Sequence, residues 1–151
     1  EVLEQLKWAT DLKGANQYQS YQGLPEFRQS IANFLLKKMN AVLNPDTEVL
    51  PLMGSKEGIA HISWAFLNKG DQVLIPELGY PTYTSVTKMV EAEPIYYPLI
   101  AAEQWRPDWT FFENLDFSRI KLIYLNYPHM PTGGQREPSD FEKVCKIGTI
   151  K

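Results

Sequence analysis

The chain has 151 residues, of which 44% are hydrophobic, 13% aromatic and 22% charged. This length and composition fit one globular domain, and the formal net charge of -3 argues against nucleic acid as the main partner. No apolar stretch is long enough to span a bilayer, and the first residues do not resemble a signal peptide. We therefore expect a cytoplasmic protein with no nucleic-acid partner and no membrane partner.

The cysteine and histidine content limits the possible chemistry. The one cysteine, Cys145, excludes an internal disulfide. Neither His61 nor His129 is near it in sequence, and it lies in an amphipathic helical pattern, so we expect a buried packing cysteine rather than a nucleophile. The two histidines are not at ligand spacing, which predicts no metal site.

The first third of the chain predicts two helices joined by a polar linker. Residues 1–12 have a loose helical spacing, and residues 13–22 form a polar, tyrosine-rich linker. Pro25 suits the first position of a helix, and Glu26 complements the positive end of the helix dipole. One apolar face follows at helical spacing: Phe27, Ile31, Phe34 and Leu35.

A short extended run at residues 48–52 leads through Gly54 and Ser55 into a helix. Backbone amides at such a helix start make an anion site together with the helix dipole, and Ser55 can cap the helix. The alternative is that Gly-Ser forms only a cap. The spacing of a Walker phosphate loop is absent.

The middle of the chain predicts a buried strand at residues 72–75, which Pro76 ends. A loop over 77–83 and a helix over 84–90 follow. Tyr80 lies just past the strand end, where it either stacks on a planar ligand or packs against the loop prolines. A further strand is expected at residues 94–99 and a loop at 105–109.

The last third predicts one more buried strand, at residues 121–125, followed by a loop in which Pro128 and Pro131 prevent further pairing. Two patterns typical of a capping box, at 110–113 and 139–142, predict helix starts. The strands and helices alternate, so we predict an α/β fold with a mostly parallel sheet and flanking helices. Ligands bind at the carboxyl ends of strands in such sheets, which makes the loop from residue 126 onward a candidate site.

Four segments together resemble the class I/II aminotransferases, the fold-type-I enzymes that use pyridoxal phosphate. Residues 18–28 (Tyr-Gln-Ser-Tyr-Gln-Gly-Leu-Pro-Glu-Phe-Arg) are similar to the N-terminal segment of that family, and residues 54–58 (Gly-Ser-Lys-Glu-Gly) to its phosphate-binding turn. Residues 79–83 (Gly-Tyr-Pro-Thr-Tyr) resemble the loop whose aromatic ring stacks on the cofactor. Residues 127–133 (Tyr-Pro-His-Met-Pro-Thr-Gly) resemble Tyr-Pro-Asn-Asn-Pro-Thr-Gly. Residues 54–61 look most like the branch that acts on diaminopimelate-type amino acids.

The resemblance implies pyridoxal phosphate as the cofactor, and an amino acid and a 2-oxo acid as substrates. It implies that Ser55 and Lys56 hold the cofactor phosphate and that Tyr80 stacks on the pyridine ring. Tyr18 would reach the phosphate of the neighbouring subunit, which implies a homodimer with shared active sites.

The chain departs from the family pattern at two positions. Met130 stands where the family has the asparagine that bonds the phenolic oxygen of the cofactor, and His129 stands where it has the asparagine before that one. A thioether is a weak acceptor and cannot donate a hydrogen bond, so we expect weaker tuning of the cofactor unless His129 substitutes.

The resemblance covers only the first part of the family's large domain. We expect residues 1–22 to form an N-terminal helix and linker and residues 23–151 to form a partial cofactor-binding domain that continues beyond the chain. The Schiff-base lysine of the family has no counterpart here, and Lys56 at the phosphate turn is not that lysine. The chain alone should not catalyse transamination.

Several alternatives stay open. One is another pyridoxal enzyme, such as a carbon-sulfur lyase or a decarboxylase, because the four segments hold the cofactor and not the substrate. A non-catalytic aminotransferase-like protein is a second, which Met130 and His129 suggest, and a simple phosphate-binding α/β module is a third. Uncovered sheet edges and helix faces also predict a chain that is marginally stable or self-associates.

Overall fold

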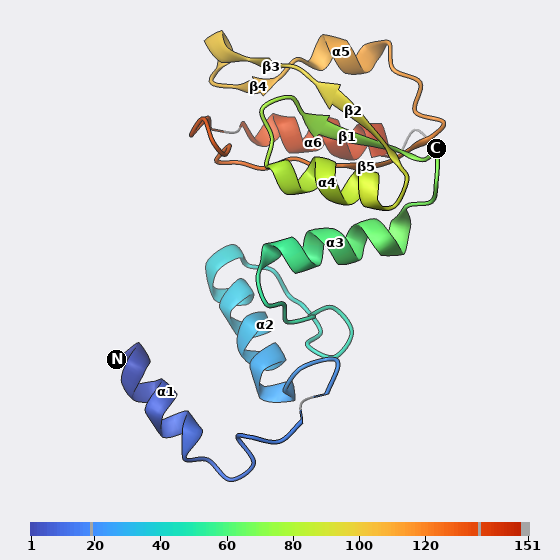
Figure 1. Ribbon diagram of the computed structural model, residues 1–151. Helices are drawn as coiled ribbons and strands as arrows, with labels where there is room; N and C mark the ends of the chain where they lie inside the picture. Colours follow the sequence, from blue (N-terminus) through green and yellow to red (C-terminus); the bar gives the residue numbers. More distant parts are fainter. Residues whose placement is uncertain (19, 136, 149–151) are drawn as a thin grey trace. The chain divides into compact units, whose positions relative to one another are not determined.

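The computed structural model describes residues 1–18, 20–135 and 137–148 (Figure 1). The chain divides into two compact units, Glu1–Met53 and Gly54–Lys151. The boundary that the sequence suggests after residue 22 stays a prediction. The first compact unit contains a buried arginine on its second helix, which binds the backbone on both sides of that helix.

The N-terminal unit contains helices α1 (Val2–Thr10) and α2 (Pro25–Met39). Pro25 occupies the first turn of α2 as predicted, and Asn40 ends the helix in the left-handed conformation at φ 54°. The predicted apolar face of α2 is present but largely uncovered within this unit, since Phe27 is 54% exposed and Phe34 58% exposed.

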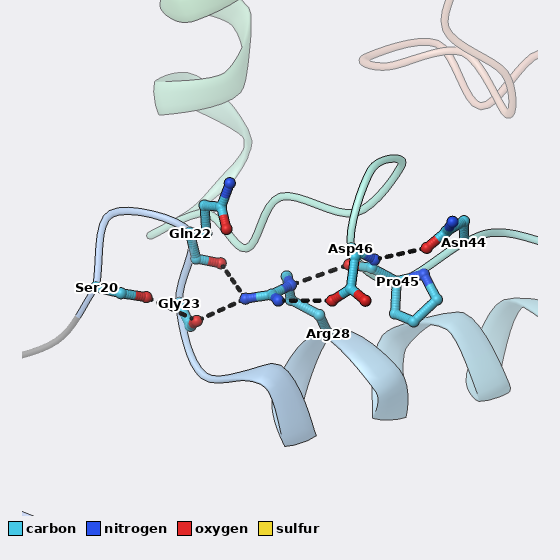
Figure 2. A network of polar contacts seen from close by, with 7 residues as sticks. All are labelled: Ser20, Gln22, Gly23, Arg28, Asn44, Pro45 and Asp46. Atoms are coloured by element: carbon cyan, nitrogen blue, oxygen red, sulfur yellow. Dashed lines mark hydrogen bonds and ion pairs between the residues drawn. The ribbon is translucent and has the colours of Figure 1, made fainter.

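Arg28 ties the N-terminal unit together (Figure 2). Its Nη1 donates to the carbonyl oxygens of Gly23 at 2.8 Å and Gln22 at 3.3 Å, and its Nε donates to Pro45 O at 2.9 Å. Its Nη2 pairs with Asp46 Oδ1 at 2.9 Å. The side chain therefore holds the turn before α2 and the loop after α2 in one place.

The C-terminal unit is built on a three-stranded sheet in the order β2-β1-β5 (Figure 1). Its strands are β1 (Gln72–Pro76), β2 (Glu93–Tyr97) and β5 (Ile120–Ile123). Both pairings are parallel, and Leu74 lies opposite Ile95 on one side and Ile123 on the other. The predicted parallel sheet with flanking helices is confirmed.

Both faces of the central strand are buried because successive side chains point to opposite faces of a sheet. Leu74 packs into a cluster that includes Phe112 of α5 (Trp109–Glu113). Val73 and Ile75 pack into a second cluster on the other face, where Tyr83 of α4 (Pro81–Met89) contributes. Helix α3 (Ser55–Phe66) lies against α4.

Several elements differ from the sequence prediction. Residues 48–52, where the sequence predicts an extended run, contain a bend at residue 48 and pair with no strand among the described residues. Helix α4 begins at Pro81 rather than at residue 84, because proline fits the first turn of a helix. A short antiparallel pair, β3 (Leu99–Ile100) with β4 (Arg106–Pro107), was not predicted. The 3-10 helix η1 (Ala101–Glu103) connects these two strands.

Helices α5 and α6 (Pro138–Gly148) begin earlier than their capping-box patterns suggested. Asp108 caps α5, and its carboxylate accepts from the backbone N–H of Thr110 at 3.0 Å. In α6, Asp140 lies inside the first turn, and its Oδ2 accepts from Glu137 N at 3.1 Å. An acidic side chain thus caps each helix start, because it is a strong acceptor for the unpaired amides there.

Asp140 joins α6 to the rest of the C-terminal unit. Its side chain is fully buried and accepts from Arg106 Nε at 3.0 Å, Arg106 Nη2 at 2.7 Å and Trp109 Nε1 at 3.1 Å. Burial by itself raises the pKa of Asp140, but Arg106 and the Glu137 backbone amide outweigh it, and the pKa is lowered.

The expectation of a buried cysteine is wrong, because the Cys145 side chain is exposed. The inward face of α6 runs through Asp140, Val144 and Ile147, at i, i+4 and i+7, and Cys145 falls beside it. Over residues 1–18, 20–135 and 137–148, no helix has the length and apolar character needed to cross a membrane, and no group of three or more acidic, histidine or cysteine side chains could hold a metal ion.

Candidate functional site

The start of α3 has the geometry of an anion site. Gly54 precedes the helix at φ 105°, a conformation that L side chains rarely adopt, and the helix begins at Ser55. The backbone amides of Ser55 and Lys56, the first two residues of the helix, have no acceptor in the helical ladder. Gly54 is the N-cap, so Ser55 is the first helical residue and not the cap. The side chains of Ser55 and Lys56 are both exposed.

Tyr80 lies at the carboxyl end of β1 and forms the N-cap of α4. The Lys56 Nζ atom lies 5.7 Å from the centroid of the Tyr80 ring, so the start of α3 and the loop after β1 converge. A hydrogen bond from Thr82, followed by the effect of Lys56, lowers the pKa of the Tyr80 phenol. The structure thus brings together three residues that the sequence singled out: Ser55, Lys56 and Tyr80.

Two further tyrosines lie behind Tyr80. The Tyr83 ring meets the Tyr80 ring edge-on, with centroids 5.9 Å apart and planes at 80°. Tyr83 then stacks on Tyr124, with centroids 4.2 Å apart and planes at 11°. Sequence reasoning missed these residues. Tyr83 carried a signal, since it lies three residues after Tyr80 at the start of a helix, whereas Tyr124 depends on the pairing of distant strands.

The loop after β5 places His129 and Met130 in opposite environments. His129 is 3% exposed, and its Nδ1 lies 2.8 Å from Thr132 Oγ1. Its Nε2 has no hydrogen-bond partner among the residues that the structure describes. Burial lowers the pKa of His129, an effect that the Leu78 backbone partly opposes. Met130 is 51% exposed.

The burial of His129 bears on its predicted role. A ring that lies among its own loop residues does not present a donor at the surface where Met130 is exposed. The backbone N–H of Met130 instead donates to Asn126 Oδ1 at 3.3 Å. Asn126 is exposed beside Met130, and the sequence did not single it out.

The loop after β5 contacts the connection between β3 and β4. The Tyr127 phenol donates to Trp105 O at 2.7 Å, and burial raises the pKa of Tyr127 to about 12. Gly134 lies so close to this connection that an added Cβ would be 2.1 Å from Gln104 O. These contacts fix the loop that carries His129 and Met130.

Tyr18 lies in the N-terminal unit, and its side chain is 95% exposed. It is available at the surface of that unit.

The chain matches a known protein family over almost its whole length. The matching family is described as aminotransferase class I and II, and the match covers residues 1–149.

Curated relatives carry one recurring name. An LL-diaminopimelate aminotransferase from Dehalococcoides mccartyi is 39% identical over 146 residues, which are 97% of this chain and 38% of that protein. An LL-diaminopimelate aminotransferase from Syntrophobacter fumaroxidans is 36% identical over 143 residues, or 95% of this chain and 37% of that protein. The chain thus spans less than two fifths of the length of these relatives.

Two solved structures superimpose closely on this chain. Substrate-bound BacF from Bacillus subtilis is 32% identical with a TM-score of 0.90, covering 97% of this chain and 37% of that one. An alanine aminotransferase from Pyrococcus furiosus is 29% identical with a TM-score of 0.82, covering 96% and 37% of the two chains.

Proposed function

The chain belongs to the class I and II aminotransferase family, and on this basis we propose that the whole protein moves an amino group between an amino acid and a 2-oxo acid. Enzymes of this family use pyridoxal phosphate. The observation that carries the proposal is the convergence of the α3 start with Tyr80, where Lys56 Nζ lies 5.7 Å from the ring centroid. That arrangement offers an anion site beside an aromatic face.

The residues present fit the two ends of pyridoxal phosphate. The amides of Ser55 and Lys56 and the positive end of the α3 dipole suit a phosphate group. The Tyr80 ring suits a pyridine ring, since aromatic rings stack favourably. The bound cofactor would supply an electron sink for chemistry next to the amino group.

This chain would contribute binding and orientation. Ser55 and Lys56 would fix the phosphate, and Tyr80 would fix the plane of the ring. The Lys56 ammonium would add a positive charge near both groups, which favours an anionic ligand. None of these roles requires Lys56 to act as a nucleophile.

We further propose that the protein acts as a homodimer with shared sites. The exposed Tyr18 phenol supports this, because a side chain that is 95% exposed is available to a second subunit. We propose a diaminopimelate-type amino acid as a substrate, which the names of relatives 36–39% identical to this chain support.

One observation favours a second function, a non-catalytic aminotransferase-like protein. The exposed loop position 130 carries a methionine, and its neighbour His129 is buried, so neither side chain offers a hydrogen-bond donor at that surface. Turnover assays of the whole protein with 2-oxo acids distinguish the two functions: amino transfer supports the enzyme, and cofactor binding without transfer supports the alternative.

Cofactor binding by this chain can be tested with pyridoxamine 5'-phosphate. This form has no aldehyde and cannot react with surface lysines, so calorimetry reports the site alone. Ser55→Asp adds a negative charge at the helix start, which should weaken binding by about tenfold or more. The same charge complements the dipole and should raise helix stability by about 0.3–1 kcal/mol. Weaker binding in a more stable protein cannot come from unfolding.

The aromatic half of the site has its own test. Tyr80→Ala should weaken pyridoxamine 5'-phosphate binding by about 1 kcal/mol or more through the lost ring contact, and should leave inorganic phosphate binding unchanged. The matched control is Tyr21→Ala, which removes a tyrosine that is 97% exposed in the other unit. Equal effects of the two substitutions would contradict the proposed site.

A further inference from the structure

The two halves of the proposed site lie on separate helices, and a series of side-chain contacts links these helices through the sheet. We call Ser63, Tyr83 and Tyr124 the tyrosine bridge. Ser63 is on α3, Tyr83 is in the first turn of α4, and Tyr124 directly follows β5. The bridge therefore connects the helix that starts at Ser55 with the residues that support Tyr80.

The hydroxyl contact of the bridge has a defined direction. Ser63 is fully buried, and its Oγ donates to Ile59 O at 3.0 Å. The Ser63 Oγ also lies 3.0 Å from the Tyr124 phenol oxygen. A serine has one O–H hydrogen, so Tyr124 is the donor and Ser63 the acceptor. This bond links α3 to the end of β5.

Tyr124 is itself fixed from two sides. The phenol of Tyr97, on β2, donates to the backbone oxygen of Tyr124 at 2.8 Å, and the backbone N–H of Tyr124 donates to Leu74 O at 2.9 Å. Its ring stacks on Tyr83 at 4.2 Å, and Tyr83 meets Tyr80 edge-on. The sheet thus sets the position of Tyr124, and Tyr124 sets the positions of α3 and Tyr83.

From these contacts we propose that Tyr124 is a positioning residue that sets the spacing between the anion-binding start of α3 and the Tyr80 ring. Ser55 is eight residues from Ser63, roughly 12 Å along a rigid helix, so a shift at Ser63 moves the helix start. A ligand with a phosphate and a planar ring gains from both contacts only when this spacing is right. This inference rests on the proposed function.

The test compares the binding of pyridoxamine 5'-phosphate with the binding of its two parts, inorganic phosphate and pyridoxamine. In this chain, Tyr124→Phe keeps the stacked ring and removes the bond to Ser63. It should weaken pyridoxamine 5'-phosphate binding by about fivefold, the value of one lost hydrogen bond, and change the affinities for inorganic phosphate and for pyridoxamine by less than about twofold. Ser63→Ala should weaken binding at least as much, because it also removes the bond to Ile59 O. The double variant should be no worse than Ser63→Ala, because the bond between Ser63 and Tyr124 is already lost in that variant.

Tyr96→Phe is the matched control. It removes a phenol that lies 3.1 Å from Thr84 Oγ1 and also links a strand to α4, but it lies outside the bridge. We expect no change with any of the three ligands. Unchanged pyridoxamine 5'-phosphate binding in Tyr124→Phe would overturn the inference, and so would an equal loss for all three ligands, which a purely structural role predicts.

Hydrogen exchange without ligand separates failure of the inference from failure of the proposed function. The bridge predicts faster exchange of α3 amides in Tyr124→Phe than in Tyr96→Phe, and equal exchange overturns it. A wild-type chain that binds pyridoxamine 5'-phosphate no better than inorganic phosphate would refute the proposed cofactor site, and the exchange data would then decide the bridge alone.

Discussion

Asp140 offers a direct test of how the C-terminal unit is held together, through the substitution Asp140→Asn. The amide keeps the shape of the side chain but removes its charge, and it places a donor where the carboxylate accepts four hydrogen bonds. Arg106 then loses the negative charge of Asp140 that pairs with it, although its side chain is 26% exposed to water. Removal of one partner from a buried ion pair costs about 3–5 kcal/mol.

We expect a loss near the lower end, about 3 kcal/mol, because water can reach Arg106. Small domains are stable by about 5–15 kcal/mol, so this loss would be a large part of the total. The assay is urea unfolding followed by circular dichroism at pH 7. Asp108→Asn is the control, because asparagine caps a helix as well as aspartate does, and it should change the free energy of unfolding by less than about 0.5 kcal/mol.

The pH dependence gives a second signature. The pKa of Asp140 is lower in the folded chain than in the unfolded chain, so its stabilisation is fully present above the unfolded value of about 4 and is lost as the pH falls through the lowered folded value. Between pH 7 and pH 3 the wild type should lose more stability than Asp140→Asn. A variant within about 1 kcal/mol of the wild type at pH 7, with the same acid profile, would refute the argued role of the Arg106 pair.

Three further expectations follow from the fold. Gly134→Ala would place a Cβ 2.1 Å from a backbone oxygen, so thermal unfolding should show that the protein loses about 1–3 kcal/mol or more of stability. Gly70→Ala is the control, because Gly70 has open space around it and the substitution measures only the cost of a positive φ. Arg28→Met should lower the free energy of unfolding, measured in urea, by about 3 kcal/mol because three hydrogen bonds to carbonyl oxygens are lost. Asp46→Asn should lower it much less, since Asp46 is 73% exposed. Sedimentation velocity should show association that grows with protein concentration, because α1 leaves Val2 82% and Leu3 72% exposed; a monomer at all concentrations would contradict this.

The elements that the sequence predicted well are those with local signals. The buried strands have continuous apolar runs, and Pro25 marks the start of α2. The start of α3 was also readable, because Gly54 before a helical pattern permits a positive φ that other residues disfavour. These features depend on a few consecutive residues, which is why Ser55 could be chosen without a structure, whereas Lys56 was chosen through the family resemblance.

The features that were missed depend on residues far apart in the chain. The two-residue strands β3 and β4 have no period to detect. At α5 the pattern from Thr110 to Glu113 matched a capping box, but the stronger acceptor two residues earlier, Asp108, caps the helix. Cys145 was placed on the wrong face because the rotation of α6 is set by the Asp140 contacts and not by the helix alone.

The candidate site also combines features with local signals and features that depend on distant residues. Tyr80 could be chosen from its place after a strand, but the contacts that orient it include a bond between Ser63 and Tyr124, which are 61 residues apart. Only the parallel pairing of β1 with β5 brings Tyr124 next to the first turn of α4. The groups that would touch a ligand are therefore encoded locally, whereas the spacing between them is encoded in the register of the sheet.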